Sequence, residues 1–187
     1  MSSPIPVLTT DRLSLRGHKK SDLKDCIEMW SNPAVTRYIG GRAFTPEEVW
    51  ARILRYVGHW ALLGFGYWLI SERSSGAFVG EVGFASFERD LTPSLGDAPE
   101  AGWIVTPAAR GKGYALEAIR AAHTWVEEVY GAQRTVCMID HDNVISQHIA
   151  HSCGYRVWSD TSYHGARVQL YERSSQLHHA AGGAGGS

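Results

Sequence analysis

Hydrophobic and polar side chains follow two periods along this chain, and each change of period marks the end of a strand or a helix. Residues 12–16 alternate in polarity, as a half-buried strand does. Apolar residues three to four apart then predict a helix that Ser21–Asp22 caps and Asn32–Pro33 ends. A second helix begins at Thr45, because an N-cap threonine, a proline and a glutamate form a capping box. Its apolar side consists of Val49, Ile53, Tyr56, Val57 and Trp60, and Gly64 to Gly66 breaks the pattern.

Strands follow these helices. Residues 67–70 and 77–87 are rich in β-branched and aromatic side chains, and Ser74 to Gly76 predicts the turn of an antiparallel hairpin between them. Residues 90–99 contain two prolines and a glycine and predict a loop. A central strand is then expected at residues 103–105, where Pro107 stops it.

A long amphipathic helix comes next, with apolar residues recurring from Ala115 to Val129 and Gly131 as its predicted end. Residues 134–139 predict a strand. If this strand lies parallel to residues 103–105, the helix between them is a right-handed crossover. The remaining expected elements are a short helix at 144–152, closed by Gly154, and a last hairpin of residues 155–158 and 167–171 around 159–165.

The pattern predicts one α/β domain over residues 1–173, with residues 174–187 as a disordered tail. The composition, 44% hydrophobic and 20% charged, is typical of a soluble globular protein, and a net charge of −1 gives no basic field for nucleic acid. No leader is evident, and no apolar run approaches the ~18 residues of a membrane span. Three cysteines without C-x-x-C spacing predict free thiols and a cytosolic protein.

The candidate chemistry lies where the central strand turns into the long helix. The first turn of a helix has unpaired N–H groups and a partial positive charge. Gly111 and Gly113 let the backbone turn tightly and approach a ligand closely, while Arg110 and Lys112 add positive charge. These features together predict a site for phosphate groups.

Two nucleotide fingerprints fail at this turn. The P-loop pattern would need glycine at Thr106 and a hydroxyl residue at Gly113, and the dinucleotide pattern would need glycine at Leu116. Residues 110–115 instead match [QR]-x-x-G-x-[GA], so the turn resembles the acyl-CoA-binding signature of the GCN5-related N-acetyltransferases (GNATs). Asn143 to Ser146, followed by Gly154–Tyr155, resembles the second block of that family, while residues 12–16, 31–39 and 79–84 resemble its RimJ/RimL-like branch.

The resemblance covers residues 12–171 and implies a single GNAT-like α/β (α+β) domain. Such a domain has a mixed, largely antiparallel, twisted sheet of about six or seven strands and about four flanking helices, with a central parallel pair splayed around the acyl-CoA. Acetyl-CoA is the implied cosubstrate, and no metal is expected. The implied cofactor-binding residues are Trp103, Ile104, Val105, Arg110, Gly111, Lys112, Gly113, Tyr114, Ala115 and Asn143.

The same resemblance ranks the candidates for proton transfer. Glu100, just ahead of the central strand, is the first candidate for general base, with an exposed strand-end carboxylate as the alternative. Glu81 is the second, although structural pairing is favoured for it. Ser146 is the candidate acid because Ala150 stands where many relatives have tyrosine; the alternative is a hydroxyl that bonds its own helix. The weaker candidates are Asp140, His141 and His123.

The acceptor pocket is expected to draw on the first helices and the loop between them, where Tyr38 and Phe44 are the better candidates. Two functions stay open. One is N-acetylation of a primary amine on a protein N-terminus, an antibiotic, an amino acid or a polyamine. The other is a non-catalytic acyl-CoA-binding regulatory module. Nucleic-acid and membrane partners are not expected, and both a monomer and a homodimer remain open.

Overall fold

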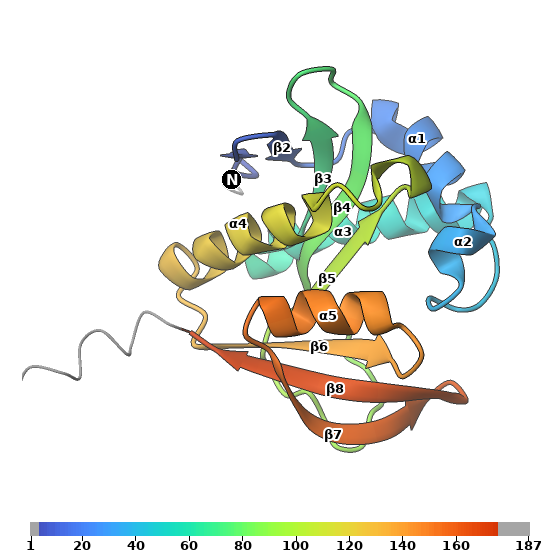
Figure 1. Ribbon diagram of the computed structural model, residues 1–187. Coiled ribbons are helices and arrows are strands. Elements are labelled where there is room, and N and C mark those ends of the chain that lie inside the picture. The colour runs from blue at the N-terminus through green and yellow to red at the C-terminus, as the bar shows by residue number, and fades with distance from the viewer. Residues whose placement is uncertain (1–3, 176–187) are drawn as a thin grey trace, which may run out of the picture.

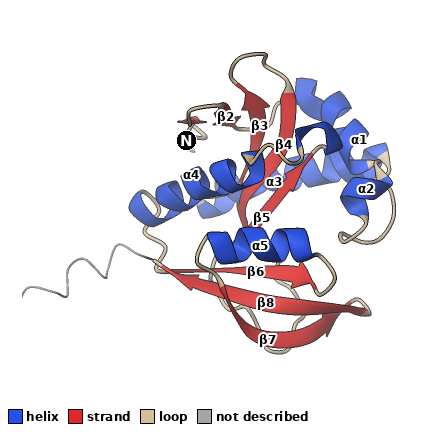
Figure 2. Cartoon of the chain, in the orientation of Figure 1, coloured by secondary structure: helices blue, strands red, loops and turns tan. Residues whose placement is uncertain are grey.

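One twisted sheet of eight strands forms the centre of the computed structural model, which describes residues 4–175 (Figures 1 and 2). The strands are β1 (Leu8–Thr9), β2 (Leu13–Arg16), β3 (Tyr67–Glu72), β4 (Phe78–Ala85), β5 (Glu100–Val105), β6 (Arg134–Asp140), β7 (Arg156–Tyr163) and β8 (Ala166–Ser174). Their order across the sheet is β1-β2-β3-β4-β5-β6-β8-β7, and only β5 and β6 pair in parallel. The predicted fold class is confirmed, with one more strand than the upper expectation.

Helices cover both faces of this sheet (Figure 1). One face packs against α4 (Tyr114–Glu128) and α5 (Val144–Ser152), and the larger apolar core lies there. The other face packs against α1 (Leu23–Trp30) and α3 (Pro46–Leu63), with α2 (Pro33–Thr36) beside them. Within residues 4–175 there are thus five α-helices, joined by the short 3-10 helices η1 (Lys20–Asp22) and η2 (Pro107–Ala109). In this part of the chain, none of the helices has the length and apolar character needed to span a membrane.

Two details of the predicted helices are corrected. Asp22 occupies the N-cap position of α1, but its carboxylate makes no cap bond to that helix and instead binds the Arg16 guanidinium at 2.8 Å through both oxygens. Val57 is 41% exposed, so it does not belong to the buried side of α3. The prediction of free thiols is confirmed, because Cys26, Cys137 and Cys153 are buried and unpaired.

The final hairpin is also tighter than expected. β7 and β8 pair up to Tyr163 and Ala166, so only His164 and Gly165 form the turn. Both have positive φ angles, 49° and 82°, as a two-residue turn between twisted strands requires. β8 continues through Ser174, at the start of the predicted tail, and residues 176–187 lie outside the described residues.

The parallel pair at the centre of the sheet opens almost as soon as it forms. Glu100 pairs with Val136, and no further pair joins β5 to β6, whereas β4 pairs with β5 along its whole length. Glu100 is therefore the first residue of the strand and not a residue ahead of it. Beyond that single pair, one edge of β5 lacks a neighbouring strand, which leaves space in the middle of the sheet.

The capping box at the start of α3 is present and yields a first prediction. The Thr45 hydroxyl accepts a hydrogen bond from the Glu48 N–H at 3.3 Å, and the Glu48 carboxylate accepts one from the Thr45 N–H at 2.8 Å. We expect Thr45→Ala to lower the free energy of unfolding by about 1 kcal/mol. The melting temperature should fall by about 2–4 °C in scanning calorimetry.

Thr124→Ala is the matched control for this prediction. Thr124 is exposed inside α4, and its hydroxyl bonds back to the Arg120 carbonyl at 3.2 Å. Because alanine is the better helix former there, this variant should not lose stability. Equal losses in both variants would show that the cap contributes nothing specific.

Candidate active site

The turn before α4 has the backbone geometry of an anion site. Gly111 and Gly113 adopt φ angles of 73° and 77°, which an L side chain rarely adopts. Within residues 4–175, the six N–H groups from Gly111 to Leu116 donate no hydrogen bond of good geometry. Residues 110–113 are exposed, so these donors can reach a ligand. The turn therefore offers a row of free donors at the positive end of a helix.

Arg12 anchors this turn from the neighbouring strand segment. Its Nη1 donates to the Lys112 carbonyl at 2.8 Å, and its Nε donates to the Glu117 carboxylate at 2.7 Å. The Tyr114 hydroxyl, bonded to the Glu72 carboxylate, fixes the first residue of α4. Sequence reasoning placed Arg12 only at the start of a strand and missed this role, which depends on a contact between distant segments.

The two basic residues of the turn differ in their surroundings. The Arg110 guanidinium donates through Nη2 to the Ala34 carbonyl at 2.6 Å, which ties the turn to α2. Lys112 is exposed, with its Nζ 5.7 Å from the centroid of the Tyr114 ring. Both residues therefore add positive charge beside the free N–H groups.

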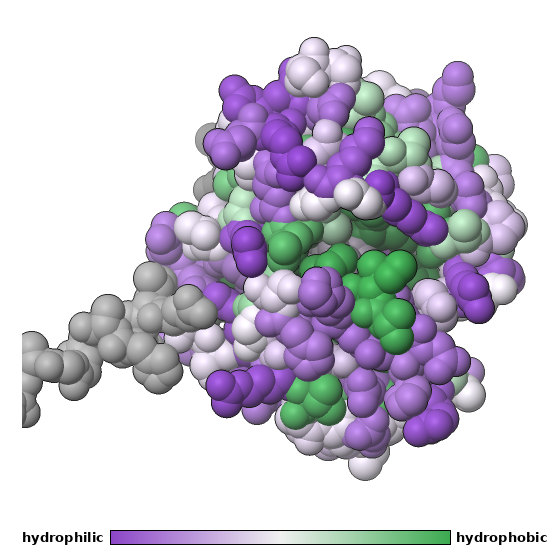
Figure 3. All heavy atoms as spheres, viewed as in Figure 1, coloured by the Kyte–Doolittle hydropathy of each residue, from purple (hydrophilic) through white to green (hydrophobic). Residues whose placement is uncertain are grey.

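An open pocket with a cavity volume of about 140 Å³ lies where β5 and β6 separate. Figure 3 shows apolar surface gathered around a hollow between α4 and α5. Five of the predicted site residues line the pocket: Glu100, Trp103, Ile104, Asn143 and Ser146. Val105 and the residues of the turn are not part of its lining, so the predicted residues divide between the pocket and the turn.

Glu100 lies at the end of the pocket where β5 and β6 are still paired. Its side chain is buried, and its two oxygens accept hydrogen bonds from Nε and Nη2 of Arg89 at 2.7 and 2.8 Å. Burial lowers the pKa of Arg89, but the Glu100 carboxylate more than offsets this and leaves the pKa raised. With 6% exposure, Glu100 is not an ordinary exposed strand-end carboxylate. It is a pocket-lining carboxylate held in a bidentate ion pair.

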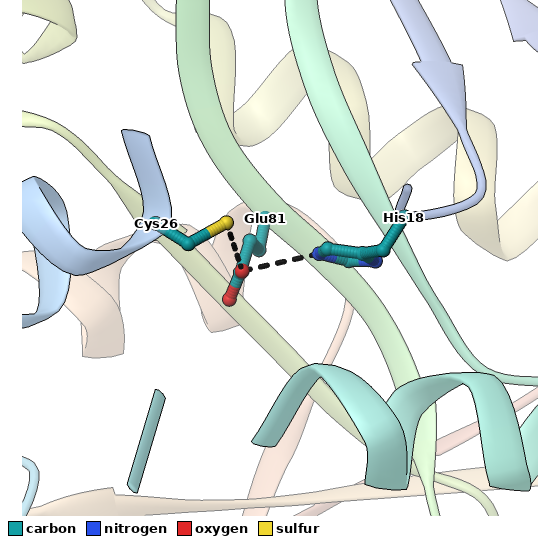
Figure 4. Close-up of side chains that lie close together, drawn as sticks. All are labelled: His18, Cys26 and Glu81. Atoms are coloured by element: carbon teal, nitrogen blue, oxygen red, sulfur yellow. Dashed lines mark hydrogen bonds and ion pairs between the residues drawn. The ribbon is translucent and has the colours of Figure 1, made fainter. Parts of the chain in front are cut away.

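Glu81 lies in the interior, next to Trp30, which lines the pocket. Its carboxylate is 0% exposed and accepts hydrogen bonds from His18 Nε2 at 3.1 Å, Trp30 Nε1 at 3.0 Å and the Cys26 thiol at 3.5 Å (Figure 4). Burial raises the pKa of Glu81, but His18, the charge of Arg52 and Trp30 together bring it below its ordinary value. Structural pairing, the interpretation favoured from sequence, describes this geometry.

The same cluster is compact enough to consider as a metal site. One donor atom each from His18, Cys26 and Glu81 lies within 4.8 Å of the others. Burial and the Glu81 charge raise the pKa of the Cys26 thiol, which donates to the Glu81 carboxylate at 3.5 Å. The hydrogen bonds from His18, Trp30 and Cys26 satisfy the Glu81 carboxylate without a metal ion. The expectation that no metal is required stays a prediction.

Asn143 and Ser146 form the opposite wall of the pocket. The Asn143 side chain accepts the Ser146 N–H at 3.2 Å and so caps α5. The Ser146 hydroxyl has no hydrogen-bond partner within residues 4–175, so it does not bond the backbone of its own helix. Asp140 also lines the pocket, with its carboxylate accepting the Asp142 N–H at 2.9 Å, while His141 is exposed. Ala150 is buried in the core.

The wall formed by α1–α3 and β3 contains residues that sequence reasoning missed. Arg52, Tyr56 and Tyr67 line the pocket together with the expected Tyr38. Phe44 stacks on Trp30 at 5.2 Å and is not part of the lining, so its assignment to the pocket is corrected. A signal for Arg52 was present, since it lies three residues after Val49 and four before Tyr56, on the buried side of α3.

His123 lies away from the pocket, packed between Phe84 and Tyr155, and is 4% exposed. Its Nε2 is 2.8 Å from the Tyr155 hydroxyl. Burial, with the charge of Arg173 as the second cause, lowers its pKa from 6.5 to about 3. The unfolded chain therefore binds a proton below pH 6.5 that the folded chain does not accept until about pH 3, so stability is lost as the pH falls.

This shift gives a second prediction. Between about pH 7 and pH 5, His123 should account for a loss of about 2 kcal/mol of stability. In His123→Gln the fall in melting temperature over that interval should be smaller than in wild type by about 4–8 °C. The exposed His148→Gln is the control and should leave the pH dependence unchanged. An unaltered pH dependence in His123→Gln would contradict the assignment.

A family model described as an acetyltransferase (GNAT) domain matches residues 12–156. The chain belongs to the GNAT acetyltransferase family. As a member of that family it is an acyltransferase, and the family resemblance inferred from the sequence is confirmed.

Solved structures share the fold of this GNAT. A protein from Bordetella pertussis assigned to the GnaT family is 31% identical, with a TM-score of 0.81 over 90% of this chain and 99% of that one. Spermidine N-acetyltransferase from Vibrio cholerae, solved with CoA and spermine, is 15% identical, with a TM-score of 0.71 over 88% and 96%. RimL, a ribosomal L7/L12 α-N-protein acetyltransferase solved with coenzyme A, is 17% identical, with a TM-score of 0.74 over 90% and 98%.

Proposed function

We propose that this GNAT transfers an acetyl group from acetyl-CoA directly to a primary amine, and that it belongs to the RimJ/RimL-like branch. The observation that carries the proposal is the opening of the sheet beyond the Glu100–Val136 pair, next to a turn with six free N–H groups. An acyl-CoA molecule needs both features, because it has a diphosphate at one end and an extended thioester arm at the other. The CoA bound to Vibrio cholerae spermidine N-acetyltransferase and to RimL supports the cosubstrate.

In this proposal the diphosphate binds the N–H groups of Gly111 to Ala115, with Arg110 and Lys112 contributing charge. The pantetheine arm lies along the free edge of β5, where Trp103 and Ile104 line the pocket, and Asn143 contacts it from α5. A backbone N–H near Ile104 or Val105 then polarises the thioester carbonyl and stabilises the oxyanion that forms on attack.

Two groups in the same pocket suit the proton transfers. Glu100 is our proposed base, which takes a proton from the acceptor's ammonium group directly or through water, so that the neutral amine can attack the thioester. The Arg89 ion pair supports this role, because it holds the carboxylate in one orientation at the pocket wall. Ser146 is the proposed acid for the departing thiolate, since its hydroxyl has no partner within residues 4–175. Ala150 carries no polar group and cannot replace it.

The test is acetyl-CoA consumption with a panel of primary amines, followed as free thiol and as the mass of the acetylated product. Amine-dependent CoA release with one acetyl group added to the acceptor is the expected result. A protein that binds acetyl-CoA but releases no CoA with any amine would be the non-catalytic module instead. If acetyl-CoA does not bind at all, both the acetyltransferase and the non-catalytic acyl-CoA-binding module are excluded.

A further inference from the structure

We propose that the acceptor of this GNAT carries a carboxylate close to its amine, as an amino acid does, and that Arg52 binds that carboxylate. The inference rests on the proposed acetyl transfer and narrows its acceptor class. It comes from one pocket-lining side chain, whose guanidinium forms no direct ion pair within residues 4–175.

Arg52 is held in place by aromatic rings. Its guanidinium carbon lies 4.0 Å from the centroid of the Trp30 ring and 4.9 Å from that of Phe44. Nη1 donates to the Tyr56 hydroxyl at 3.2 Å. Nε is buried and has no acceptor within residues 4–175. The guanidinium thus lines the pocket in a fixed plane with donors to spare.

The charge of Glu81 acts on Arg52, but in the described part of the chain none of the nearby carboxylates lies within ion-pair distance of its guanidinium. The Glu81 carboxylate accepts from His18, Trp30 and Cys26, and the Glu100 carboxylate is occupied by Arg89. A partly buried guanidinium with an unpaired Nε and no direct ion pair favours an anionic ligand.

The charge of Arg52 is nevertheless maintained. Burial lowers the pKa of Arg52, but Tyr56 and the Glu81 charge raise it above its ordinary value. Because a guanidinium keeps its proton in proteins, the pocket contains a permanent positive charge beside its aromatic wall. An acceptor that brings a second cation to that wall would be repelled.

The geometry of arginine selects among the open acceptor classes. Its planar fork matches the two oxygens of a carboxylate, whereas a polyamine or an aminoglycoside offers further ammonium groups. Tyr38, Tyr56 and Tyr67 supply the surface for an acceptor's side chain. Arg52 and Glu100 line the same pocket, so one small molecule can present a carboxylate to Arg52 and an amine to Glu100. A free amino acid meets both requirements in one small molecule.

The experiment compares free amino acids with their amides and with the amines left after decarboxylation, in the same acetyl-transfer assay. Polyamines, aminoglycosides and short peptides complete the panel. We expect the free acid of at least one amino acid to exceed its amide in kcat/KM by about 10- to 100-fold, the size of a charge-assisted hydrogen-bonded contact. This comparison uses the wild-type protein and needs no variant to fold.

Substitutions of Arg52 then test whether this residue causes the preference for the free amino acid over its amide. Arg52→Met should raise KM for the amino acid while leaving the amide unaffected, and Arg52→Lys should restore part of the preference. Arg55→Met is the matched control, because Arg55 is exposed on the same helix, contacts Phe87 and does not line the pocket. It should keep the wild-type preference.

The failures of the two proposals are distinguishable. Turnover of polyamines, aminoglycosides or amides at rates equal to or above those of the free acids would overturn the carboxylate inference and leave acetyl transfer intact. A preference for the acid that survives in Arg52→Met would also overturn it. Bound acetyl-CoA with no turnover of any amine would overturn the proposed function itself.

Discussion

Replacing Gly113 with valine is expected to weaken acetyl-CoA binding on the order of 100-fold and to remove the rise in melting temperature that acetyl-CoA produces. Gly113 has a φ angle of 77°, and valine there costs on the order of 1–3 kcal/mol of strain. Relief of that strain would turn the N–H groups of the turn away from the diphosphate. Loss of one charge-assisted hydrogen bond to the diphosphate, at about 1.5–3 kcal/mol, accounts for a change of this order.

Gly131→Val separates ligand binding from general strain. Gly131 follows α4 at its other end, with a φ angle of 84° and open space in the direction that a side chain would take. This variant should lose a similar amount of stability in the free protein, yet acetyl-CoA should still raise its melting temperature. Isothermal titration gives the two affinities directly. An undiminished affinity in Gly113→Val would mean that the diphosphate binds elsewhere.

The parts of this fold that sequence predicted best are those with local causes. The capping box at Thr45 and the glycines of the turn act within a few residues, so their structure can be inferred from neighbouring positions. The short α5 is another such case, because Asn143 caps it from the adjoining loop. The helix boundaries there agree with the expectation.

The features that could not be predicted from the sequence depend on contacts between distant segments. Glu100 reads as a strand-end carboxylate until Arg89, from the loop before it, is placed against it. Arg12 could not be connected with the turn more than ninety residues later. Arg52 lay on a predicted buried stripe, but its lack of a counter-ion became visible only with the positions of Glu81 and Glu100 known. Partners of charged groups are properties of the tertiary structure.

Glu100→Gln is expected to lower kcat by about 100- to 10,000-fold, the range for a removed general base, while acetyl-CoA affinity stays within a few-fold. The amide has nearly the same shape, and its oxygen can still accept from Arg89, so the pocket should keep its form. It cannot take a proton from the ammonium. Single-turnover rates, together with acetyl-CoA titration, separate the chemical step from binding.

The ion pair with Arg89 demands a second comparison, because a carboxylate that only holds the loop in place would also be sensitive to substitution. Arg89→Gln breaks the same pair but leaves the carboxylate. If Glu100 is only structural, both variants should lose similar stability and similar activity, since each leaves one buried partner unpaired. If Glu100 is the base, Arg89→Gln should retain far more activity than Glu100→Gln, even where the two variants have the same melting temperature. Equal activities in the two variants would move the base to another group in the pocket.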